Sequence, residues 1–97
     1  MRRRVNARSE RKASQRTTLV SRTALRVLAG ISEAELTLWE HEEFVAPVDK
    51  TFAAGGEPLY DSSTLRRARL IRTLAEQLEV NLPGIGVILH LLDQMER

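Results

Sequence analysis

The strongest constraint on this fold is a short stretch, residues 30–47, that contains the signals for both ends of one helix. Ser32 is a favourable N-cap residue. Glu35, three positions later, completes a capping box in which the two residues satisfy each other's backbone N–H groups. Pro47 prevents the helix from continuing. The stretch therefore predicts a helix that starts after Ser32 and ends before Pro47.

One face of this helix is apolar. Ile31 precedes the cap, where it can pack on Leu36 as a hydrophobic staple. Trp39 follows Leu36 by three positions, and Phe44 and Val45 close the apolar run. This spacing is typical of a helix that packs on a core along one side.

The preceding residues predict a second short helix. Residues 19–29 form an amphipathic segment with Ser21 as its N-cap, and Gly30 is the C′ residue that ends it. Two short helices joined by a turn that contains glycine form the helix-turn-helix pattern. When such a motif binds DNA, its second helix enters the major groove.

The outward side of the second helix is acidic, which conflicts with binding to DNA. Its predicted outward positions are Glu33, Glu35, Thr37, Glu40, Glu42 and Glu43. Attraction to phosphate supplies much of the affinity of proteins for DNA, and this face would repel phosphate.

The net charge of +2 hides a split along the chain of 97 residues. Residues 1–30 contain nine Lys or Arg and one acid, which gives a charge of 9 − 1 = +8. Residues 31–97 contain six Lys or Arg and twelve acids, which gives a charge of 6 − 12 = −6. Residues 1–17 contain few apolar side chains and predict a disordered basic tail, with the folded domain at 18–97. The tail is either an electrostatic arm for nucleic acid or a solvated extension.

The segment from Val48 to Tyr60 predicts a small β-hairpin wing, with a turn at the two glycines 55–56. Lys50 is the one cation that this wing offers. Asp61 or Ser62 then caps a third helix that runs to about residue 79. Its arginines, Arg66, Arg67, Arg69 and Arg72, either contact phosphate or form ion pairs with Asp61 or the acidic second helix.

The last helix, about residues 82–96, is apolar on several sides, with Asn81 as a plausible N-cap. We expect Ile85, Ile88, Leu92 and Met95 to form one stripe, with Val87, Leu89 and Leu91 on other faces. The helix is either the centre of the core or partly an exposed patch for a partner.

No catalytic site, cofactor or metal site is predicted, and we expect no enzyme activity. The chain has no cysteine, His41 lies among glutamates on a solvated face, and His90 lies in the apolar last helix. No apolar run reaches the roughly 20 residues of a membrane span, and no secretory signal follows the basic N-terminus. A bacterial-type cytoplasmic protein is the expectation.

Several segments together resemble the MerR-like winged helix-turn-helix superfamily: residues 21–47, the two glycines 55–56, Tyr60-Asp61 and residues 82–85. The resemblance covers about residues 19–95 and is closest to the CbpM-type chaperone modulators. Its most specific part is Leu-Pro-Gly-Ile-Gly-Val-Ile-Leu-His-Leu-Leu-Asp, which is similar to the last helix of that family. The implied fold is mainly α-helical, with a small β-hairpin wing and two C-terminal helices.

The sequence departs from MerR regulators that bind DNA. At Thr37 those proteins typically have an arginine, at Leu38 an aromatic residue, and in the wing a Gly-aromatic-Arg motif where this chain has Gly-Glu-Pro at 56–58. They also continue into a long antiparallel dimerisation helix. These departures argue against DNA reading and leave the scaffold intact.

The resemblance implies a modulator that binds the J-domain of a DnaJ/CbpA-type co-chaperone and restrains its activity. An acidic face would steer association with a basic J-domain helix, and an apolar anchor would add affinity. The candidate partner-binding residues are Glu33, Glu35, Trp39, Glu40, Glu42, Glu43, Leu89 and Leu92, although a tryptophan in this position is more commonly part of the core.

The alternative is a MerR-family transcriptional regulator that binds DNA through the tail and the third helix. Its candidate residues are Arg2, Arg3, Arg4, Arg8, Arg11, Lys12, Arg16, Arg66, Arg67 and Arg69. A homodimer through the C-terminal helix is a further possibility.

Overall fold

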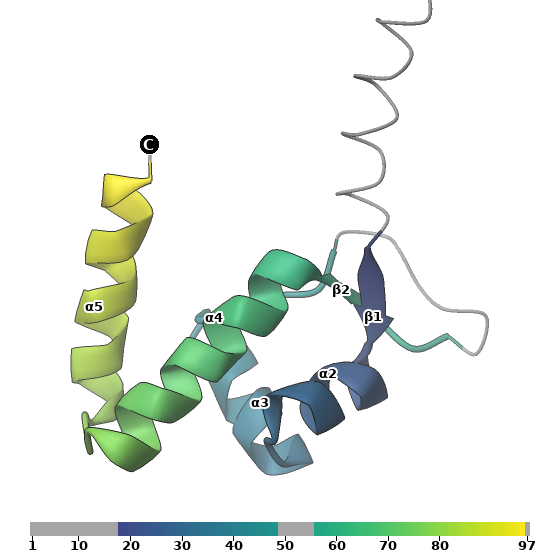
Figure 1. The fold of residues 1–97 in the computed structure, drawn as a ribbon, viewed down its shortest axis with the longest axis horizontal. Helices are drawn as coiled ribbons and strands as arrows, with labels where there is room; N and C mark the ends of the chain where they lie inside the picture. The colour runs from purple at the N-terminus through teal and green to yellow at the C-terminus, as the bar shows by residue number, and fades with distance from the viewer. Residues whose placement is uncertain (1–17, 49–55, 97) are drawn as a thin grey trace, which may run out of the picture.

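A computed structural model describes residues 18–48 and 56–96 of the chain (Figure 1). Its elements are, in order, β1 (Leu19–Ser21), α2 (Arg22–Ala29), α3 (Glu33–His41), β2 (Leu59–Asp61), α4 (Ser62–Arg72), the π-helical turn η1 (Thr73–Gln77) and α5 (Leu82–Met95). The mainly α-helical fold with a helix-turn-helix, a small sheet and two C-terminal helices is confirmed. The predicted tail, residues 1–17, lies outside the described residues.

Local capping signals place the two helices of the motif where the sequence predicts them. The Ser21 hydroxyl accepts from the Ala24 N–H at 3.1 Å and starts α2. Gly30 ends α2 in the left-handed region, with φ of 72°. The capping box of α3 is present, with Ser32 N donating to the Glu35 carboxylate at 2.9 Å and Glu35 N donating to the Ser32 hydroxyl at 3.1 Å.

Replacing Gly30 by alanine is expected to lower the free energy of unfolding by about 1–2 kcal/mol, because the left-handed conformation is strained for a residue with a Cβ. The added methyl would also overlap the Arg72 guanidinium, which packs beside Gly30. Gly86→Ala is the control: Gly86 lies inside α5, and its new Cβ would meet Phe44 at an ordinary 3.5 Å. That variant should be neutral or stabilise the fold by up to about 1 kcal/mol. Equal losses in urea unfolding of the two variants would contradict this account.

The first predicted helix begins later than expected, because Leu19–Ser21 is a strand. β1 pairs antiparallel with β2 in the register Leu19↔Asp61, Val20↔Tyr60 and Ser21↔Leu59. The pairing partner lies far along the sequence, so the local apolar pattern could not reveal it. One hydrogen bond of the predicted wing lies within the described residues: the Val48 N–H donates to the Leu59 carbonyl at 2.8 Å. Lys50 and the outgoing part of the wing lie outside the described residues.

The third helix begins where it is predicted, but α4 ends at Arg72, and only the turn η1 continues to Gln77, close to the predicted end at about residue 79. Asp61 caps it through the Thr64 N–H at 2.9 Å. The helix then widens into the π-helical turn η1, and Glu79 turns the chain in the left-handed region with φ of 52°. No sequence pattern predicts this π-helical turn.

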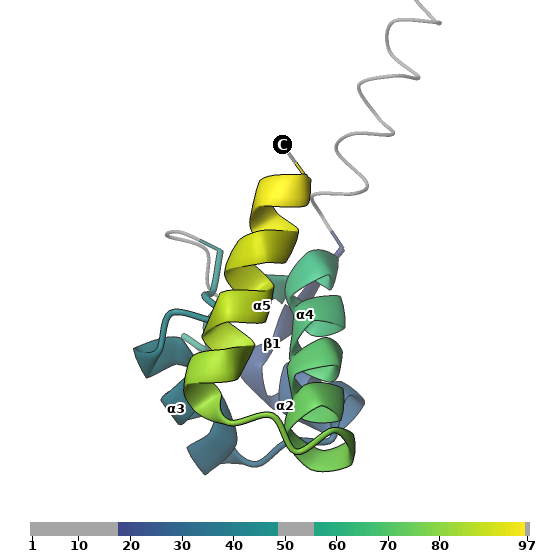
Figure 2. The same cartoon turned by 90° about the vertical axis from the view of Figure 1, so that its left-hand side faces the viewer.

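The last helix packs on η1 and runs in the opposite direction to α4 (Figure 2). Ile85 and Leu89 are buried, whereas Met95 is 79% exposed. The predicted stripe is therefore wrong at two positions: Leu89 belongs to the core face and Met95 does not. The described core is formed by side chains of every helix, of η1 and β2, and of the segments on either side of α3. Its buried members are Leu25, Ala29, Ile31, Leu36, Trp39, Phe44, Val45, Tyr60, Ala68, Ile71, Leu74, Ile85 and Leu89.

Candidate functional site

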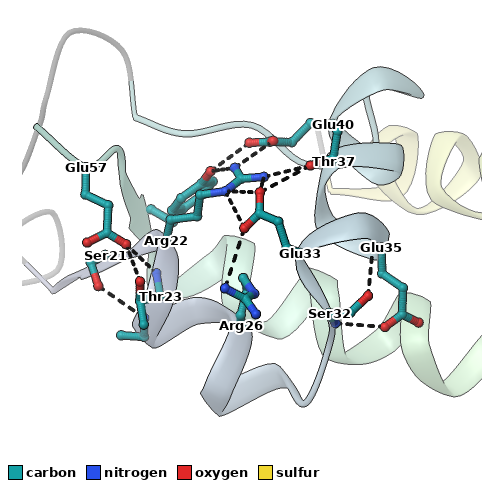
Figure 3. A network of polar contacts seen from close by, with 12 residues as sticks. Ser21, Arg22, Thr23, Arg26, Ser32, Glu33, Glu35, Thr37, Glu40 and Glu57 are labelled. Carbon is teal, nitrogen blue, oxygen red and sulfur yellow. Dashed lines mark hydrogen bonds and ion pairs between the residues drawn. The ribbon is translucent and has the colours of Figure 1, made fainter.

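The centre of the helix-turn-helix face is the guanidinium of Arg22, at the start of α2 (Figure 3). Its Nε and Nη2 donate to the Glu33 carboxylate at 2.9 and 2.7 Å. Its Nη1 donates to Glu40 at 2.8 Å and to the Tyr60 hydroxyl at 2.7 Å. Nη2 also reaches the Thr37 hydroxyl at 3.1 Å. One side chain therefore joins both helices of the motif to the sheet. We call these five residues the Arg22 cluster.

The Arg22 cluster is only partly open to water. The Arg22 side chain is 17% exposed and that of Glu40 is 24% exposed. Tyr60 is fully buried, and its hydroxyl donates to Glu40 at 2.7 Å. Burial, followed by this hydrogen bond to a carboxylate, raises the pKa of Tyr60 to about 12.

This raised pKa gives a test of the geometry, because Tyr60 is the only tyrosine in the chain. Absorbance titration of the folded protein should give a phenol pKa of about 12, against 10.0 for the unfolded chain. The folded value is the higher one, so the stabilisation is fully present below pH 10 and is lost as the pH rises towards 12. Circular dichroism reports whether the chain is folded at each pH. A phenol pKa near 10 in the folded chain would contradict the buried contact with Glu40.

The protein itself neutralises part of the predicted row of outward carboxylates. Hydrogen bonds from Arg22 lower the pKa of the Glu33 carboxyl, and Arg26 lies 3.5 Å from the same group. Glu35 is engaged in the capping box. Glu40 points inward to the Arg22 cluster, so its predicted outward position is wrong.

Two acids of this face are exposed at the C-terminal end of α3. Glu42 is the C-cap residue, and Glu43 follows it in the left-handed region with φ of 63°. Neither side chain has an ion-pair partner within residues 18–48 and 56–96. These are the acids of the face that a basic partner could reach most freely.

A contact that the sequence did not reveal joins the base of the wing to α2. The Glu57 carboxylate accepts from both the backbone N–H and the hydroxyl of Thr23, each at 2.6 Å (Figure 3). These hydrogen bonds lower the pKa of Glu57. A carboxylate therefore occupies the positive end of α2. No local pattern relates two residues 34 positions apart.

Two predicted apolar anchors lie in the core. Trp39 is 3% exposed and Leu89 is 2% exposed, so neither offers its side chain to a partner in this conformation. Leu92 is half-buried and lines a cleft between α4 and α5. Of these three side chains, only Leu92 is accessible from the surface.

The arginines of α4 do not lie together as one cationic patch, and their predicted partners are wrong. Arg67 bridges to Asp93 of α5 at 2.7 and 3.1 Å, Arg72 lies 3.3 Å from Glu76, and Arg69 donates to the Leu28 carbonyl. Asp61 is used as the N-cap instead. Arg66 is exposed and has no partner among the described residues.

The described residues are acidic in sum, and α3, the second helix of the helix-turn-helix, is poor in cationic side chains. Residues 18–48 and 56–96 contain six arginines and eleven Asp or Glu, which gives 6 − 11 = −5. α3 contains no lysine or arginine. The predicted basic arm, residues 2–16, lies outside the part of the chain that the structure describes.

Comparison with protein families places this geometry in a known group. The family described as MerR HTH family regulatory protein matches residues 21–97, which span the motif, the sheet and both C-terminal helices. The chain belongs to this family. A comparison with curated protein sequences found no match. The predicted MerR-like superfamily is thus confirmed.

Two further properties of the described helices bear on function. None of them is long and apolar enough to cross a membrane. Among the described residues, no three His, Asp or Glu side chains are grouped in a way that could hold a metal ion.

Proposed function

We propose that this member of the MerR HTH family is a non-catalytic regulator that acts in the bacterial cytoplasm by binding another protein. The observation that supports this proposal most strongly is the recognition helix: α3 has no lysine or arginine, and its first carboxylate is fixed by Arg22. Such a helix has no lysine or arginine to attract the phosphates of DNA.

The partner we propose is the J-domain of a DnaJ/CbpA-type co-chaperone, whose activity the chain would restrain. This part rests on the resemblance of the last helix to the CbpM-type modulators. Glu42 and Glu43 are the acids that we propose for a basic J-domain helix, because Glu33, Glu35 and Glu40 already have partners within the chain. Complementary charge of this kind mainly raises the association rate and the specificity.

The test is a titration of the full-length chain with a J-domain at low ionic strength. We expect the double variant Glu42→Lys/Glu43→Lys to bind about tenfold more weakly than the wild type, and the difference should shrink as salt is added. The matched control is Glu79→Lys/Glu96→Lys, which changes the net charge equally; Glu79 shares the left-handed backbone of Glu43. An equal loss in both variants would show that only net charge matters, and the acidic α3 end would be discarded as the binding surface.

A second candidate function is DNA-binding transcriptional regulation, which the family description favours. It would use the arm at residues 2–16 together with Arg66, Arg67 and Arg69. Of these three arginines, Arg67 and Arg69 are already engaged within the chain. The arm would therefore have to supply most of the phosphate contacts.

A further inference from the structure

The two C-terminal helices diverge and leave a cleft between them. α4 and α5 meet where η1 joins them and separate towards the N-terminus of α4 and the C-terminus of α5 (Figure 1). The cleft has a volume of about 240 Å³. Its apolar floor is formed by Leu70 of α4 and by Leu89 and Leu92 of α5.

α5 also exposes apolar side chains outside the cleft. Leu91 is 52% exposed and Met95 is 79% exposed, and the two lie one turn apart. Leu92 is half-buried, but it is not among the described side chains that pack on the core. Exposed apolar surface beside a cleft is typical of a site for another chain.

The polar rim of the cleft consists of Ser63, Arg66, Arg67, Asp93 and Glu96. Arg67 and Asp93 already satisfy each other across the cleft at 2.7 Å. Arg66 lies one turn before Leu70 on the same wall, is exposed and has no partner among residues 18–48 and 56–96. A guanidinium binds a carboxylate with two parallel hydrogen bonds, which makes it a selective receptor for Asp or Glu.

We propose that the cleft between α4 and α5 binds an amphipathic helix of a partner protein that places one bulky apolar side chain on Leu70 and Leu92 and an Asp or Glu on Arg66. Since Arg66 and Leu70 are one turn apart, the acid and the apolar anchor of the partner are three or four residues apart. A helix fits because it completes a layer over two diverging helices.

This site is separate from the proposed J-domain surface. The end of α3 attracts a basic segment through Glu42 and Glu43, whereas Arg66 selects an acidic one. The two proposals can therefore fail independently.

The experiment is selection from a displayed library of randomised helical peptides against the full-length chain. We expect enriched peptides to contain Asp or Glu three or four residues from Leu, Ile, Met or Phe. A synthetic peptide of the enriched sequence should bind at least about tenfold more weakly to Arg66→Glu and to Leu92→Ser. A peptide with Lys in place of its acid should regain binding to Arg66→Glu. Glu79→Lys, on the connection before α5, is the control and should bind like the wild type.

Several results would overturn the proposal. One is the absence of any enriched peptide, and another is enrichment of Lys or Arg in place of acids. A third is binding of the peptide to the Arg66→Gln and Leu92→Ala variants that equals its binding to the wild type, provided that thermal unfolding shows both variants to be folded. Light scattering provides a further result. If the chain alone is a dimer that Arg66→Glu dissociates, a second copy covers the cleft and the partner-helix proposal is wrong.

Discussion

Replacing Arg22 by methionine is expected to lower the free energy of unfolding by about 2–3 kcal/mol, below the range for a fully buried ion pair because the cluster retains some contact with water. Methionine keeps an unbranched apolar stem and removes the guanidinium with its charge and its donors. The change leaves the inward carboxylate of Glu40 with Tyr60 as its remaining described partner. It also removes the contacts that join α2 to Glu33 and Thr37 of α3.

The matched control for this prediction is Arg26→Met in the same helix. Arg26 is 34% exposed and lies 3.5 Å from Glu33, so its loss should change the stability by less than about 1 kcal/mol. Urea unfolding followed by circular dichroism measures both variants. The double variant Arg22→Met/Glu40→Gln should regain part of the loss, because the uncompensated charge is gone. Similar losses for Arg22→Met and Arg26→Met would show that the Arg22 cluster has no special role.

Deleting residues 1–17 is expected to remove nearly all binding of this protein to duplex DNA, a loss of at least about a hundredfold at low salt. The segment contains seven of the fifteen Lys and Arg of the chain, whereas residues 18–48 and 56–96 have a net charge of −5. Each phosphate neutralised contributes about 0.9 to the slope of log affinity against log salt concentration, so the deletion should flatten that slope by up to about six.

A control separates charge from length: the seven Lys and Arg of residues 1–17 are replaced by glutamine. This variant should lose DNA binding as fully as the deletion does. Binding to a J-domain should be retained by both proteins. If duplex binding and its salt slope survive in both, the folded body itself binds DNA and the proposed role of α3 is wrong.

Sequence signals predicted those parts of the fold that neighbouring residues determine. Ser21, Ser32, Asp61 and Asn81 each accept from a backbone N–H three positions later, so a short window of sequence contains all the information needed to place a helix start. Gly30 marks the helix end for the same reason.

Features that depend on distant segments could not be predicted in this way. β1 exists because β2 lies beside it, and Glu40 points inward because Arg22 and Tyr60 meet it there. The sequence around Glu40 does not show these partners, so it predicts an exposed position for this residue. The identities of the arginines in α4 were visible in the sequence, but the positions of Asp93 and of the α2 carbonyls that they contact were not.

In the folded chain, the acids of α3 without an ion-pair partner among the described residues or a capping role lie at the C-terminal end of the helix. The sequence offered five glutamates as one surface, whereas the structure uses three of them to stabilise the motif. The same neutralisation weakens the electrostatic case against DNA, since Arg22 and Arg26 offset part of the acidity of α3. The absence of lysine and arginine from α3 is unaffected by it.

The most direct test of the central claim is to titrate the full-length chain with a J-domain and with duplex DNA in the same buffer at physiological salt. A protein regulator should bind the J-domain saturably, and duplex DNA should bind weakly, without sequence preference and through residues 1–17. Sequence-selective binding of duplex DNA that survives removal of residues 1–17, with no binding of the J-domain, would contradict the account and identify the chain as a DNA reader.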